Sequence, residues 1–194
     1  MSDSEHSDLD RAACSAALAA FLAEARDLRL AAAADAQHGG RRQRLREWQA
    51  ARLARTHADL LASPRYGRAA TFFLSDLYGP KDFSERDAEV ERILPLMTTM
   101  LPVSGLRTLL LAVEVDALSE RFDAAMVKVL GAALDRKLSE SAYAAAYREV
   151  GDRGGRLLQI RLVGETGEAL DALARKSFVR GALKMMHGPA HLAG

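Results

Sequence analysis

A stripe of apolar residues over positions 106–130 constrains the fold more than any other feature of the sequence. Large apolar side chains recur there mostly three or four residues apart, while charged residues such as Arg107 and Glu114 lie mostly elsewhere. This spacing is typical of an amphipathic α-helix with one buried face. The stripe therefore predicts a central helix whose core residues include Leu110, Val113, Phe122 and Met126.

The other long segments are also rich in helix formers. Alanine is abundant, aromatic residues make up 6% of the chain, and β-branched residues do not alternate with polar ones. These features favour helices and argue against a sheet. A chain of 194 residues that is 49% hydrophobic is long enough to bury one core. We therefore expect an all-α, single-domain helical bundle of about six to eight helices with no significant sheet.

Composition and glycine positions suggest how this domain is divided. We expect a flexible acidic tail over residues 1–8 and a helical domain over residues 9–194, with its C-terminal end possibly incomplete because the last residues resemble the start of another apolar segment. Gly39-Gly40 is expected to end the first helix. A late helix over residues 156–174 is expected to turn inward Leu157, Ile160, Val163, Gly164 and Leu170.

Charge and cysteine usage exclude several classes of protein. The formal net charge is +1, which provides no overall attraction to nucleic acid or to an anionic membrane. Cys14 is the one cysteine, so the chain has no intrachain disulfide and is compatible with the reducing cytosol. The N-terminus lacks a signal-peptide pattern, and no apolar stretch approaches the ~20 residues that a membrane span needs. We expect a cytoplasmic protein with no membrane partner.

Two further clusters have ordinary structural interpretations. Six arginines lie within residues 41–55, but no nucleic-acid-binding motif accompanies them, so we interpret them as a solvated helix face that pairs with acidic neighbours. His187 and His191 have the spacing of helical metal ligands, but Gly188-Pro189 interrupts a helix between them. No nucleophile, kinase or dinucleotide motif is present. We therefore expect no catalytic residue, no metal and no cofactor, and we do not expect nucleic acid as a partner.

Residues 72–87 contain the densest group of unusual side chains. Three of the six phenylalanines lie there, together with a tyrosine and several charged residues around Gly79-Pro80. In a helical hairpin the aromatic rings either pack the turn or line a pocket whose mouth carries the charges. The candidate binding residues are Phe72, Phe73, Asp76, Tyr78, Asp82, Arg86 and Asp87.

This stretch resembles the signature of the FFLEE motif proteins, a family of uncharacterised bacterial helical proteins. The matching residues are Phe72-Phe73-Leu74, Tyr78-Gly79, Asp82-Phe83 and Arg86-Asp87. Ser75-Asp76 stands where the motif has Glu-Glu, so the resemblance implies no role that needs two carboxylates there. The likeness covers residues 65–126 most strongly and is weaker over residues 182–194. Family members have no assigned activity, and the resemblance therefore implies no reaction.

Two hypotheses for function follow from these observations. The first is a non-enzymatic helical module that mediates protein–protein interaction, or self-association, through the 72–87 region. The alternative is a small-ligand binder or enzyme with a pocket of carboxylates and arginines around Asp76, Asp82, Arg86 and Asp87. Carboxylates that converge in a concave pocket would favour the second hypothesis, and carboxylates that face solvent singly would argue against it.

Overall fold

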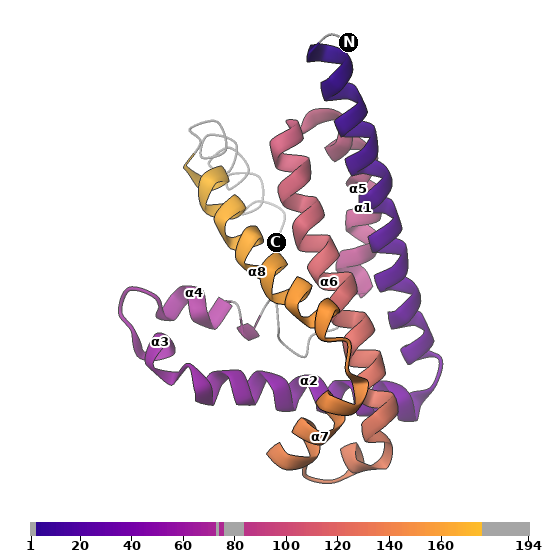
Figure 1. Cartoon of the computed structure of the whole chain (residues 1–194), viewed down its shortest axis with the longest axis vertical. Helices are drawn as coiled ribbons and strands as arrows, with labels where there is room; N and C mark the ends of the chain where they lie inside the picture. The colour runs from indigo at the N-terminus through magenta and orange to yellow at the C-terminus, as the bar shows by residue number, and fades with distance from the viewer. Residues whose placement is uncertain (1–2, 73, 76–83, 176–194) are drawn as a thin grey trace, which may run out of the picture.

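The structure is a computed structural model that describes residues 3–72, 74–75 and 84–175. This part of the chain is helical and contains no strand, which confirms the all-α fold. None of its helices is both long enough and apolar enough to cross a bilayer. The elements are α1 (Asp3–Ala33), α2 (Ala36–Thr56), α3 (Ala58–Ala62), α4 (Gly67–Phe72), α5 (Ser84–Met100), α6 (Val103–Leu130), the 3-10 turn η2 (Gly131–Asp135), α7 (Glu140–Val150) and α8 (Arg153–Ala174) (Figure 1).

The centre of the bundle is the pair α1 and α6, which lie side by side and run in the same direction (Figure 1). Ion pairs mark this parallel register, because Arg107 of α6 contacts Asp10 at 2.7 Å and Arg121 contacts Glu24 at 2.9 Å. Helix α5 also packs against α1. Arg11 of α1 donates hydrogen bonds to two carbonyl oxygens near the C-terminal end of α5 and so satisfies backbone acceptors that the helix leaves free.

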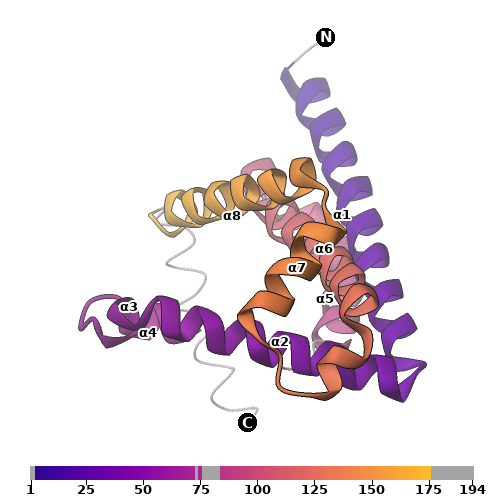
Figure 2. The ribbon, with the colours of Figure 1, turned by 60° about the horizontal axis from the view of Figure 1, so that its bottom comes forward.

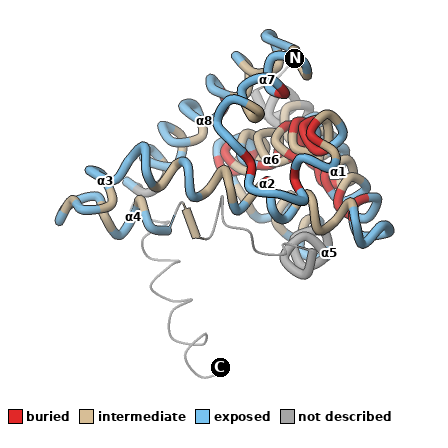
Figure 3. The backbone as a smooth tube through the Cα atoms, turned by 90° about the horizontal axis from the view of Figure 1, so that it is seen from below, coloured by how far each residue is buried: buried red, intermediate tan, exposed pale blue. Residues whose placement is uncertain are grey.

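Three apolar clusters along α6 form the core. The first joins α6 to α1, the second joins it to α2, η2 and α7, and the third joins it to α8. Figure 3 shows the buried residues gathered where α1, α2 and α6 meet. The prediction of a central helix is confirmed, since Val113, Phe122 and Met126 are buried. Leu110 is partly buried and packs at the edge of the first cluster.

The break between the first two helices lies earlier than the glycines predict. Helix α2 begins at Ala36, because the side chain of Asp35 accepts hydrogen bonds from the backbone N–H groups of Gln37 and His38 and caps the helix. Gly39 and Gly40 therefore lie inside α2, and the prediction that they end the first helix is wrong.

The acidic N-terminal residues belong to a helix rather than to a separate tail. Helix α1 begins at Asp3, so residues 3–8, which the sequence assigns to the tail, form the start of this helix.

Helix α8 turns a different face to the core from the one that the sequence predicts. Leu162 is buried, and Gln159 donates a hydrogen bond of 2.8 Å to Ser119 of α6. The prediction that the other stripe points inward is wrong, because all five of its residues are exposed. The exposed fractions are 56% for Leu157, 68% for Ile160, 43% for Val163 and 46% for Leu170, and Gly164 is also exposed.

The second half of α2 leads away from the bundle to α3 and α4, which pack on each other (Figures 1 and 2). We call residues 57–72 and 74–75 the arm. The arm and α8 project from the same side of α6 in both views. Gly67 allows the close packing of the arm, because a Cβ at this position would lie 2.6 Å from the carbonyl oxygen of Leu61.

Replacing Gly67 with alanine is therefore expected to force α4 away from α3 at a cost of about 1–3 kcal/mol to the closed arm. Amide hydrogen exchange in α3 and α4 should accelerate while the melting temperature of the bundle stays nearly constant. Gly40→Ala is the matched control, because a Cβ there meets nothing within 4 Å. That substitution is expected to stabilise α2 by about 0.5–1 kcal/mol. Equal exchange rates in the Gly67 variant and the wild type would contradict the expectation.

Candidate functional site

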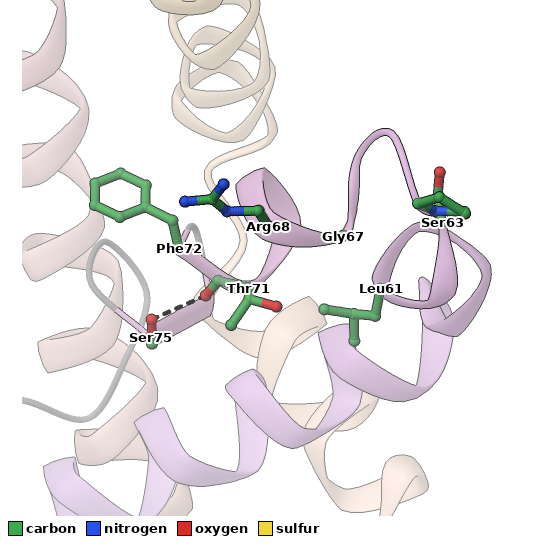
Figure 4. Close-up of a pocket in the computed structure, with 8 residues that line it drawn as sticks. Leu61, Ser63, Gly67, Arg68, Thr71, Phe72 and Ser75 are labelled. Carbon is green, nitrogen blue, oxygen red and sulfur yellow. Dashed lines mark hydrogen bonds between the residues drawn. The ribbon is translucent and has the colours of Figure 1, made fainter.

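A hollow of about 610 Å³ lies between the two short helices of the arm. Figure 4 shows Leu61 of α3 and Thr71 of α4 pointing toward each other across it, while the ring of Phe72 points away from α3. Ser75 donates a hydrogen bond of 2.9 Å to the carbonyl oxygen of Thr71 and continues the wall. The lining residues are Leu61, Ser63, Pro64, Gly67, Arg68, Thr71, Phe72 and Ser75.

The arm combines exposed aromatic rings with positive charge. Tyr66 and Phe72 are exposed, and the guanidinium of Arg65 lies 5.2 Å from the centroid of the Tyr66 ring. Arg68 adds a second cation at the wall of the hollow. Tyrosine and arginine are enriched among the residues that dominate protein–protein binding energies. The arm is therefore suited to contact an apolar surface that also carries carboxylates.

The structure places the candidate residues from the sequence only in part. Phe72 ends α4 and lines the hollow. Arg86 and Asp87 lie in the first turn of α5, but their side chains are outside the described set. Phe73, Asp76, Tyr78 and Asp82 are outside the described residues altogether. The hollow instead brings in Leu61 and Arg68, which the sequence analysis did not select.

A second group of polar side chains lies inside the bundle, where α1, α2 and α6 meet. Glu120 of α6 is 1% exposed and accepts hydrogen bonds from three guanidinium groups. Arg29 of α1 donates to it at 3.0 Å, and Arg42 and Arg46 of α2 also donate to its carboxylate. Arg29 additionally contacts Asp116 at 2.6 Å. We call this set, together with Asp123, the arginine–carboxylate cluster.

Charges in the arginine–carboxylate cluster shift one another's ionisation. Burial by itself raises the pKa of Glu120, but Arg46, Arg42 and Arg29 together hold it below its ordinary value. Burial raises the pKa of Asp123 above its ordinary value despite contacts from Arg46 at 3.4 Å and Gln49 at 3.2 Å. Because three arginines and three carboxylates meet, the cluster is formally neutral. Separation of these helices would leave buried charges without their partners, which is costly.

The arginines of α2 pair with carboxylates, as the sequence analysis predicts, but they do not form one solvated face. Arg42 and Arg46 are largely buried in the cluster. Arg41 and Arg44 contact Asp135 of η2 at 2.6 and 2.7 Å, and Asp135 has a pKa below its ordinary value because of the hydrogen bond from Arg41. Farther along α2, Arg52 and Arg55 contact Glu140 of α7 at 3.2 and 3.0 Å.

Arg156 joins three helices through aromatic contacts. Its guanidinium carbon lies 3.7 Å from the ring centroid of Phe122 on α6 and 4.4 Å from that of Tyr147 on α7. Its buried Nε and Nη2 atoms form no hydrogen bond. The two rings provide the favourable contact for the cation instead. Elsewhere within the described residues, no three His, Cys, Asp or Glu side chains are grouped closely enough to hold a metal ion, and His187 and His191 lie outside that part.

These features define an all-helical bundle with a projecting helical arm. Over residues 28–194 the chain matches the family described as "Domain of unknown function (DUF8198)", and it belongs to that family. No curated protein and no solved structure is significantly similar to the chain. The resemblance to FFLEE motif proteins stays a prediction, because the family description refers to no such motif.

Proposed function

We propose that this protein is an interaction module whose arm binds an apolar, acidic segment of a partner protein. The observation that carries the proposal is the exposure of Tyr66 and Phe72 beside Arg65 and Arg68 on a hairpin that projects from the bundle. Phe72, a candidate from the sequence, belongs to this surface. The proposed class of function is therefore the one that the sequence predicts, but most of the binding surface precedes the 72–87 region in the chain.

The arm has the features of a binding surface rather than of core packing. Helices α3 and α4 pack mainly on each other, and about half of the surface of Tyr66 and of Phe72 is exposed there. Burial of an exposed aromatic ring against a partner removes a large apolar area from water. The two arginines would pair with carboxylates that flank the apolar part of the partner.

The test is affinity purification from cells of the native host, with three forms of the full chain compared quantitatively. The double variant Tyr66→Ala/Phe72→Ala should lose at least about tenfold of any specific partner, which corresponds to about 1.4 kcal/mol of binding free energy. Leu30→Ala is the matched control, because Leu30 is an equally exposed apolar residue on α1. Both variants should keep the wild-type melting temperature, since exposed substitutions change stability by about 0.5 kcal/mol or less.

A charge reversal tests the chemistry of the partner. Arg68→Glu should weaken binding of the partner that the first experiment recovers, and added salt should weaken binding of the wild type. Identical recovery by the wild type, the double variant and the control would reject the arm as the binding surface.

A small ligand is the second candidate for the arm, because polar groups line the hollow, which is wide open to solvent. Hydroxyl groups of Ser63 and Thr71 and the cation of Arg68 would orient a ligand with an anionic group. Screening of small carboxylates and phosphates by thermal melting separates this candidate, because a ligand that binds only the native state raises the melting temperature.

We also propose that the protein works in the cytoplasm. Its single cysteine, Cys14, is a buried free thiol in the first apolar cluster. A protein that does not depend on a disulfide bond for stability is suited to a reducing compartment. Fractionation of host cells with an antibody to the native chain tests this location.

A further inference from the structure

Helix α8 leaves an ordered stripe of apolar residues exposed. Ile160, Val163, Gly167 and Leu170 follow one another at spacings of three, four and three residues, which is the repeat of a helix-pairing seam. All four are exposed, and the side of α8 that carries Leu162 faces α6 instead. Within the described residues, the core therefore forms without this stripe.

No contact within the described residues requires a glycine at position 167. A glycine inside a helix costs about 0.5–1 kcal/mol relative to alanine. At Gly167 an added Cβ would meet nothing within 4 Å, so the packing of α8 in its own chain does not require the missing side chain. An absent side chain in an exposed apolar seam allows the backbone of a second helix to approach closely.

The stripe is complementary to itself in an antiparallel arrangement. If two copies of α8 cross at position 165, Ile160 of each copy meets Leu170 of the other, and Val163 meets Gly167. Large residues then meet at both ends of the seam, and in the middle the side chain of Val163 fills the space above Gly167. Glu165 itself lies on another face of the helix, where it pairs with Arg161 at 3.7 Å.

The charges of α8 favour the same arrangement. Residues 153–161 contain three arginines and no acidic residue, whereas residues 162–174 contain three acidic residues and no basic one. This distribution opposes the helix dipole, because cations are unfavourable near the N-terminal end and anions near the C-terminal end. Arg156 is held by Phe122 and Tyr147 of its own chain, but Arg153 and Arg161 are exposed. In an antiparallel pair these two arginines would lie beside the acidic half of the second copy.

We propose that α8 forms a twofold symmetric, antiparallel interface with α8 of a second copy of this chain. The same patch serves both subunits, as in most homodimers. The interface uses α8 and not the arm, so it is independent of the binding function proposed above. The occupant is a second copy of this chain, because the features of α8 are complementary to themselves in an antiparallel pair. These features are the apolar spacing, the glycine and the separation of basic from acidic residues.

Sedimentation of the full chain over a wide concentration range is the first test. The wild type should form a dimer, and Ile160→Glu should raise its dissociation constant at least about a hundredfold because a charge would be buried in the seam. The matched control is Leu96→Glu, since Leu96 is exposed to a similar extent on α5 and should leave the dimer unchanged. A monomeric wild type, or a dimer that survives Ile160→Glu, would overturn the proposal.

Disulfide trapping then tests the antiparallel register. Val163→Cys and Gly167→Cys proteins should cross-link to each other when they are mixed under oxidising conditions, with the bond mapped to positions 163 and 167 by mass spectrometry. Each variant alone should cross-link poorly, because a disulfide needs Cα atoms within about 7 Å. Efficient cross-linking of Gly167→Cys with itself would indicate a parallel pair and would reject the register. If Ile160→Glu lowers the melting temperature of a monomeric chain, the stripe is covered by the chain itself and the proposal fails.

Discussion

Replacing Glu120 with glutamine is expected to lower the free energy of unfolding by about 3–5 kcal/mol, although the two side chains have nearly the same shape. The substitution leaves the guanidinium groups of Arg29, Arg42 and Arg46 facing one another without the carboxylate that they share. Uncompensated charge in a buried site is costly. Chemical denaturation of the variant and the wild type measures the difference, and a change below about 1 kcal/mol would contradict the expectation.

An exposed ion pair on the same two helices provides the control. Glu24→Gln removes a partner of Arg121 in a pair between α1 and α6 that solvent reaches, so it should cost about 0–1 kcal/mol. The contrast between the two glutamine variants isolates the effect of burial, because both remove one carboxylate that links α1 to α6.

The Glu120 variant should also change how stability depends on pH. Because the folded state holds the pKa of Glu120 below its ordinary value of 4.5, the carboxylate contributes its full stabilisation above that pH. The contribution disappears as the pH falls through the lower pKa of the folded state. The stability difference between the wild type and Glu120→Gln is therefore expected to shrink as the pH falls below about 4.5. Burial raises the pKa of Asp123, so this carboxyl group changes stability in the opposite direction as the pH falls.

Leu106→Ala is the second substitution with a large expected effect. Leu106 is fully buried between α6 and α1 and packs with Leu18 and Leu22. Truncation of such a side chain costs about 2–5 kcal/mol, because transfer free energy is lost and a cavity remains. For a chain of this size the loss corresponds to a fall of about 4–20 °C in melting temperature. Leu110→Ala removes the same atoms from a partly buried site and should cost clearly less.

The core around α6 could be predicted from sequence because its signal is local. Apolar residues three or four apart on one segment determine which face is buried, and Val113, Phe122 and Met126 confirm this. Helix α8 shows where the same reasoning fails. Leucine, isoleucine and valine occur around most of its circumference, so periodicity alone did not distinguish the buried Leu162 from the exposed Ile160.

Interactions between distant segments were not accessible to sequence reasoning. The arginines of α2 are conspicuous in the sequence, but the partners of Arg46 on α6 lie more than 70 residues away, and no local pattern identifies them. The arm illustrates the same limit. Its hollow depends on the approach of Gly67 to Leu61, and no pattern in the sequence shows that these two residues meet. The Asp35 cap, in contrast, had a recognisable signal that the following glycines obscured.

The parallel pairing of α1 with α6 has a consequence for synthesis of the chain. Arg29 and Glu120 are 91 residues apart, so α1 leaves the ribosome long before its main partner exists. At about 5–20 residues per second, translation of that interval takes about 5–20 s. During this time Leu18 and Leu22 have no α6 to cover them, so these apolar side chains lack their main native contacts on the nascent chain. Native structure at the N-terminus therefore waits for the middle of the chain to be made.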